Sequence, residues 1–158
     1  MLSSLKRKPS PPIDPAIDQW VIAEHEEEGL PIILRFRAEA PDIDLPSYPV
    51  LINIYWRYEP GRDQGMPGSA DYYRMVALEE LLEPAEAQGI GCQVLSITGN
   101  SRREWAWYVK SDQAFLAALN NLLAGQEQFP IEIEAASDPE WSNYRALLGT
   151  VQKSPTSI

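Results

Sequence analysis

One stretch of the chain constrains the fold more than any other: residues 103–110 read Arg-Glu-Trp-Ala-Trp-Tyr-Val-Lys. Side chains alternate along a β-strand, so Trp105, Trp107 and Val109 would share one face while Tyr108 points to the other. Two Trp side chains bury roughly 300 to 500 Å² of surface, and that much apolar area is costly to leave in water. We therefore predict a central strand whose indole face belongs to the core.

Helices and turns are predicted on both sides of this strand. Residues 90–97 are rich in β-branched side chains, and Gly99-Asn100 tolerates positive φ, so residues 90–110 predict a β-hairpin. Apolar residues at helical spacing predict a helix that Ser69 or Asp71 caps and that Pro84 kinks or ends. A second helix is predicted that Ser111 and Asp112 can cap, with Gly125 as its stop.

The rest of the chain supplies further strands and a closing helix. Alternating apolar residues predict an N-terminal hairpin of residues 19–28 and 30–38, a strand over residues 50–58, and a short strand over residues 129–135. Asp138-Pro139 then reads as the start of a last helix. We expect Trp141 and Tyr144 on the inner face of that helix, where they pack on the sheet instead of stacking on a ligand.

From residue 50 onward the predicted order is strand, helix, strand, strand, helix, strand. This is the split βαβ, or ferredoxin-like, α+β arrangement, with an antiparallel sheet and both helices on one face. The N-terminal hairpin would extend the sheet, and the last helix would cover an edge or an end. We expect one domain over residues 19–149, a disordered Pro-rich arm over residues 1–18 and a disordered tail over residues 150–158.

Charge narrows the classes of partner. The 158-residue chain has a net charge of −10, and residues 19–149 hold 21 Asp and Glu against 9 Arg and Lys. Such a surface repels phosphate backbones, so we expect no nucleic-acid partner, whereas a basic protein is compatible. The sequence contains neither a secretory signal nor an apolar run of membrane-spanning length. The single cysteine, Cys92, fits a reducing compartment, and we expect a cytoplasmic protein.

The aromatic strand, the helix after it and the closing segment Asp138-Pro-Glu-Trp-Ser-Asn-Tyr144 together resemble the bacterial domain-of-unknown-function family 695. The resemblance covers residues 20–148. It departs in the basic, Pro-rich arm and in the ending Leu147-Leu148-Gly149. The resemblance implies a ferredoxin-like α+β fold similar to that of the regulator of ribonuclease E activity B, an acidic protein that binds a nuclease. The family has no assigned catalytic residues, so it implies none for this chain.

The sequence also contains no recognisable catalytic or cofactor motif. His25 and Glu27 would share a strand face, but one His and one carboxylate make an incomplete metal site. Cys92 has no neighbouring base and reads as a small buried residue. Helical spacing aligns Glu79 with Glu83 and Glu83 with Glu86, either as a solvated face or as a surface for a basic partner. We therefore expect no catalytic residue, no metal and no cofactor.

Tyr55, Arg57 and Tyr108 form the most interesting group. We place them on the sheet face away from the two helices, where Tyr and Arg are typical of interface hot spots. Coverage by the N-terminal hairpin or self-association into a homo-oligomer would explain them equally well.

Two functions follow from these patterns. The first is a non-enzymatic protein-binding or regulatory module that inhibits or neutralises a basic partner such as a nuclease. Its expected partner surface comprises Tyr55, Arg57, Tyr108, Glu79, Glu83 and Glu86. The alternative is an enzyme or small-ligand-binding protein that uses a cleft beside Tyr55, Arg57 and Tyr108.

Overall fold

The computed structural model describes residues 20–59 and 64–153. The predicted arm over residues 1–18 lies outside these ranges, as do residues 154–158 of the predicted tail. The elements are β1 (Trp20–Glu27), β2 (Leu30–Arg37), the 3-10 turn η1 (Leu45–Ser47), β3 (Val50–Arg57), α1 (Ser69–Ala87), β4 (Gly91–Gly99), β5 (Arg102–Val109), α2 (Asp112–Leu122), β6 (Ile131–Ser137) and α3 (Ser142–Lys153).

Six strands form one antiparallel sheet in the order β1-β2-β4-β5-β3-β6. The predicted α+β class is confirmed, and the N-terminal hairpin extends the sheet because β2 pairs with β4. Both predicted hairpins have two consecutive turn residues with positive φ: Glu28 and Gly29 in the first, Asn100 and Ser101 in the second. Paired positive φ values match the right-handed twist of the flanking strands.

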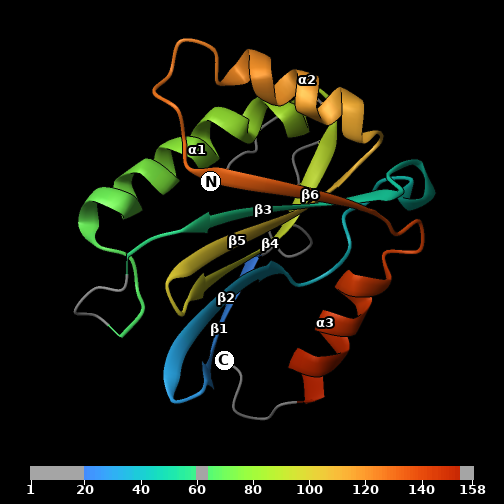
Figure 1. Cartoon of the computed structure of the whole chain (residues 1–158). Coiled ribbons are helices and arrows are strands. Elements are labelled where there is room, and N and C mark those ends of the chain that lie inside the picture. Colours follow the sequence, from blue (N-terminus) through green and yellow to red (C-terminus); the bar gives the residue numbers. More distant parts are fainter. Residues whose placement is uncertain (1–19, 60–63, 154–158) are drawn as a thin grey trace.

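The indole face of β5 is buried, as predicted. Trp105 and Trp107 are 2% exposed and Val109 is fully buried. They pack with Ile52, Ile54 and Trp56 of β3, with Met75, Leu78 and Leu82 of α1, and with Phe115 and Leu119 of α2. Figure 1 shows α1 and α2 together on this side of the sheet.

The prediction that the last helix covers an edge or an end of the sheet is wrong. α3 and the turn before it lie against the opposite face of the sheet from α1 and α2 (Figure 1), where Trp141 and Tyr144 pack with Leu51, Val94 and Tyr108. The physical reason is that the aromatic ring of Tyr108 points away from α1 and α2. Covering that ring with the larger indole of Trp141 removes more apolar surface from water than covering a strand edge would.

Helix boundaries differ from the predictions in three places. α1 follows Gly68, which has no side chain to cap it, so neither Ser69 nor Asp71 is the cap. Of the two predicted effects of Pro84, the end of the helix is excluded: α1 continues three residues beyond it, because a proline in the last turn removes little of the hydrogen-bond ladder. α3 runs to Lys153 and so includes the first four residues of the predicted tail. The predicted cap of α2 is confirmed, since the Ser111 hydroxyl accepts a hydrogen bond from the Ala114 amide at 3.1 Å.

Candidate functional site

Tyr55 and Arg57 lie where they were expected, on the face of β3 that points away from α1 and α2. The Tyr55 hydroxyl donates to Glu134 at 3.1 Å, and Arg57 forms an ion pair with Glu132, both on the neighbouring strand β6. Tyr55 stands opposite Glu104 of β5 in the strand register. We call this group of Tyr55, Arg57, Glu104, Glu132 and Glu134 the open acidic face.

Carboxylates from two strands make this face negative. The side chains of Glu132 and Arg57 are both about two-thirds exposed, at 67% and 65%. Glu104 is partly buried, and that burial raises the pKa of its carboxyl against the opposing charge of Arg102, with a further increase from Glu134 and Glu27. The acidic β1–β2 hairpin lies close to the face: the Asn100 side chain, in the turn before Glu104, donates to Glu27 at 3.5 Å, and the charge of Glu27 acts on Glu104.

Tyr108 does not belong to this surface, which corrects the prediction that placed it beside Tyr55 and Arg57. Its side chain is fully buried, and its ring stacks on Trp141 with centroids 4.1 Å apart and planes 9° apart. The strand alternation behind the prediction was right, but the half of the face that holds Tyr108 is the half that α3 covers.

The closing motif of residues 138–144 explains this coverage. Asp138 accepts four hydrogen bonds: from the Tyr108 hydroxyl at 2.6 Å, from the Ser142 amide at 2.8 Å, and from the amide and side chain of Asn143 at 3.0 Å each. Burial alone would raise the pKa of the Asp138 carboxyl, but these donors lower it to about 2. One carboxylate thus joins the start of α3 to the central strand.

Trp141 and Tyr144 complete the attachment of α3. The Trp141 indole donates to the backbone carbonyls of Leu45 and Tyr48 at 3.2 and 3.1 Å. The Tyr144 hydroxyl donates to the Arg37 carbonyl at 2.6 Å, and burial raises its pKa to about 12. The Asp138 carboxylate, the Trp141 indole and the Tyr144 hydroxyl each bond to another part of the fold, so the motif is structural.

The carboxylates of α1 do not form one common face. Glu79 accepts hydrogen bonds from the Trp105 indole at 2.7 Å and from Arg103 at 3.5 Å, and Glu86 pairs with Arg37 at 3.0 Å. Of the three predicted partner residues on this helix, only Glu83 is exposed. The prediction of one aligned surface fails because helical spacing alone could not show that Glu79 and Glu86 reach charged and polar groups of the sheet.

Glu86 also compensates for an irregularity in the sheet. The register between β4 and β5 shifts between Gln93 and Leu95. Both backbone groups of Gln93 bond to side chains: its amide donates to Glu86 at 2.8 Å, and its carbonyl accepts from Arg37 at 2.8 Å. The Arg37–Glu86 pair therefore ties α1, β2 and the bulge of β4 together.

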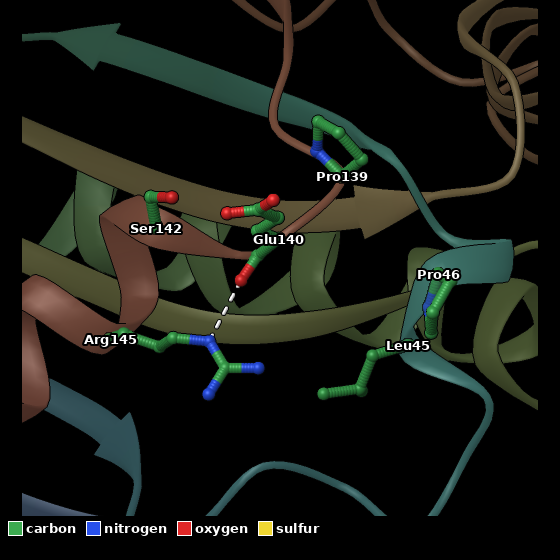
Figure 2. A pocket seen from close by; sticks show the side chains of 6 residues that line it. All are labelled: Leu45, Pro46, Pro139, Glu140, Ser142 and Arg145. Carbon is green, nitrogen blue, oxygen red and sulfur yellow. Dashed lines mark hydrogen bonds between the residues drawn. The ribbon is translucent and has the colours of Figure 1, made fainter.

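A groove of about 330 Å³, open to solvent, lies between η1 and the start of α3 (Figure 2). Its lining contains a single carboxylate, Glu140, and the Arg145 guanidinium, whose Nε donates to the Glu140 carbonyl at 2.8 Å. General acid–base catalysis by a carboxylate pair needs two such groups, and this groove supplies one. The other lining residues are Leu45, Pro46, Pro139 and Ser142.

The other singled-out residues do not assemble into a chemical site. Across residues 20–59 and 64–153, no three His, Cys, Asp or Glu side chains cluster to hold a metal ion. His25 and Glu27 are both exposed near the tip of the β1–β2 hairpin, and Cys92 is buried beneath α3. None of the helices in the described part of the chain is both long and apolar enough to cross a membrane.

Comparison with known proteins places the chain in a family. A model of the family of unknown function DUF695 matches residues 18–148. The chain belongs to this family. The resemblance drawn from the aromatic strand and the closing motif is therefore confirmed, and in this DUF695 chain that motif holds α3 on the sheet. No match was found among curated proteins.

Proposed function

We propose that this DUF695 chain is a non-enzymatic, cytoplasmic protein-binding module that recognises a basic partner through its open acidic face. The observation that carries the proposal is the gathering of Glu104, Glu132 and Glu134 around Tyr55 on the half of the sheet face that α3 leaves uncovered. Carboxylates beside Tyr and Arg suit a surface that attracts cationic side chains and then packs against them.

The chain's net charge of −10 supports the same partner chemistry, because it accelerates encounter with a cationic protein. A basic enzyme such as a nuclease, which the module would inhibit or neutralise, is the concrete version we propose. We also infer a ferredoxin-like core, because the order β4-β5-β3-β6 suits a split βαβ unit. Similarity to the regulator of ribonuclease E activity B is then an analogy between folds, and fold alone does not fix function.

The alternative function, a ligand cleft beside Tyr55, Arg57 and Tyr108, has less support. Tyr108 lies beneath Trp141, and the groove of Figure 2 is lined by none of these three residues.

Salt-dependent capture from the native host tests the proposal. The full chain should retain a basic protein in stoichiometric amount, and binding should weaken as salt screens exposed charges. Glu132→Gln combined with Glu134→Gln keeps the hydrogen-bonding shape but removes two charges, so it should weaken binding at least about tenfold, or about 1.4 kcal/mol.

The matched control is Glu80→Gln combined with Glu83→Gln, which removes the same charge from exposed positions on α1. Binding should be almost unchanged in this variant. If the α1 pair abolishes binding and the β6 pair does not, the partner surface lies on α1. Recovery of no basic partner, together with specific retention of a small molecule, would refute the binding module and favour the ligand-binding alternative.

A further inference from the structure

β1 is one of the two outer strands of the sheet, and its first half has no charged side chain to discourage pairing with another strand. An outer strand presents backbone groups that can pair with another strand. Residues 20–23 carry no charge, whereas all of Glu24, Glu26, Glu27 and Glu28 follow them. On the face that β1 shares with α1, the side chain of Ile22 is 59% exposed. β1 therefore combines an uncharged, pairing-competent segment with an exposed apolar side chain.

Beside this segment lies a cation, Arg35, that has an aromatic contact but neither a hydrogen bond nor an ion pair with any described residue. The Arg35 guanidinium sits over the Trp20 ring at 4.3 Å from its centroid, and the Arg37 guanidinium sits over the same ring at 5.0 Å. Burial lowers the pKa of Arg35; the charge of Glu79 opposes this effect, as does that of Glu86, whereas the charges of Arg103 and Arg37 add to it. Within the described ranges, Arg35 has no hydrogen bond or ion pair, although a guanidinium group has five N–H donors.

The carboxylates closest to Arg35 bond to other groups. Glu79 accepts from Trp105 and Arg103, and Glu86 pairs with Arg37 and with the Gln93 amide. Glu79 and Glu86 stabilise the Arg35 charge only from a distance, so a partly buried cation with two like charges nearby would gain from an anion in direct contact. A carboxylate could reach Arg35 from the edge of β1 that is not paired with β2.

A second copy of the chain can supply that carboxylate from β1 itself. A twofold axis normal to the sheet pairs two outer strands antiparallel and keeps like faces together. If the axis passes between the two Ile22 residues, Val21 lies opposite Ala23 of the second copy, and Trp20 lies opposite Glu24 of the second copy. Each Glu24 then stands beside the Trp20 ring that carries the unpaired Arg35 guanidinium.

We propose that the chain forms a symmetric dimer through β1, in which Ile22 packs on its own copy and Glu24 of each copy pairs with Arg35 of the other. This surface is distinct from the open acidic face and goes beyond the proposed function. A second copy is the occupant because two adjacent strands of one chain hold both halves of the complementary pair, Glu24 on β1 and Arg35 on β2. Registers centred on Glu24 would place like charges opposite each other, which is destabilising.

Pairing of about five residues per strand covers far less than a standard protein interface. The dimer is therefore weak and depends on concentration. Sedimentation equilibrium of the full chain at low salt should show a monomer–dimer equilibrium that shifts toward the monomer as salt is raised.

Three substitutions test the geometry. Glu24→Lys places a cation beside Arg35 of the other copy, so it should raise the dimer dissociation constant at least about tenfold. Ile22→Lys should do the same by placing two cations at the axis. Glu26→Lys is the matched control, because it makes the same charge change on the same face of β1 beyond the paired segment. The control should leave the dissociation constant within about twofold.

Mixing provides a complementary measurement. Arg35→Glu and Glu24→Lys should each be mainly monomeric alone, and a mixture should form a heterodimer because each Glu–Lys or Glu–Arg contact is then restored. Circular dichroism establishes that both variants are folded. A wild-type chain that stays monomeric over the whole concentration range overturns the proposal. So does a dimer that survives both Glu24→Lys and Ile22→Lys, or one that Glu26→Lys disrupts and Glu24→Lys does not.

Discussion

At the scale of single residues, Asp138 is a buried carboxylate that joins α3 to the sheet through several hydrogen bonds. It is 5% exposed, and it accepts hydrogen bonds from Tyr108, Ser142 and Asn143. A carboxylate with several donors stays ionised in a buried position, because the donors stabilise the charged form more than burial disfavours it. The same bonds make the attachment of α3 sensitive to acid.

We predict that Asp138→Asn makes the free energy of unfolding depend less on pH at acidic pH. The pKa of Asp138 is about 2 in the folded chain and about 4 in an unfolded one. Its contribution, about 2 kcal/mol, is therefore fully present above pH ~4 and is lost as the pH falls toward ~2. Urea unfolding of both proteins across this window should show a stability difference that shrinks as the pH falls.

Glu140→Gln is the control, since Glu140 is exposed and lies two residues away. It should reproduce the wild-type dependence of the free energy of unfolding on acidic pH. A stability difference between wild type and Asp138→Asn that is constant from neutral pH to pH ~2 would contradict the assigned pKa.

At the scale of elements, the Arg37–Glu86 pair links parts that no local pattern connects. The Arg37 side chain is 8% exposed, and it reaches from β2 to the end of α1 and to the bulge of β4. Removing one partner of a partly buried ion pair leaves the other charge less compensated, which can cost more than the intact pair contributes.

We predict that Glu86→Gln lowers the free energy of unfolding by about 1–3 kcal/mol. The amide can still accept from the Gln93 backbone, so the loss measures mainly the charge pairing between Arg37 and Glu86. In a double-mutant cycle by urea unfolding, Arg37→Gln with Glu86→Gln should cost less than the sum of the single substitutions.

Glu83→Gln, an exposed position on the same helix, should change stability by less than about 0.5 kcal/mol. Equal effects of Glu83→Gln and Glu86→Gln would show that the Arg37–Glu86 pair does not stabilise the fold.

At the scale of the whole molecule, two aromatic clusters lie on opposite faces of one sheet. Trp56, Trp105 and Trp107 are in the cluster under α1 and α2, and Trp141 is in the cluster under α3. All four are at most 2% exposed, whereas Trp20 of β1 is only partly buried. Of the five Trp side chains, Trp20 should therefore be the one whose fluorescence is most sensitive to solvent and to quenchers dissolved in it.

We predict that the Trp emission of the folded chain is blue-shifted and moves to longer wavelength on unfolding. Acrylamide should quench only a small fraction of the fluorescence of the folded chain. Trp20→Phe keeps a ring beneath Arg35 and Arg37 but should remove most of the quenchable fraction. Strong quenching that persists in Trp20→Phe would mean that one of the two cores is open to solvent. The quenching curves of the two folded proteins provide the measurement.

Much of the architecture could be predicted because it is encoded in short stretches. Alternation assigned Trp105 and Trp107 to the core and Tyr55 and Arg57 to the other face. Helical spacing found most of the buried residues of α1 and α2, but Tyr72 and Leu116, which share the same spacing, are 46% and 40% exposed. These signals span a few residues, since period-2 and period-3.6 patterns follow from backbone geometry alone. The DUF695 family was recognisable for the same reason.

Contacts between distant segments were decided only by the tertiary structure. Tyr144 reaches Arg37 across 107 positions, and Arg37 reaches Glu86 across 49. No local period shows which face α3 covers or which carboxylates turn inward, because those choices depend on what is already buried nearby. The sequence by itself determined the strands, the helices and the indole core. Packing decided that Tyr108 lies beneath Trp141, and that Tyr55 and Arg57 remain on the open half of the sheet.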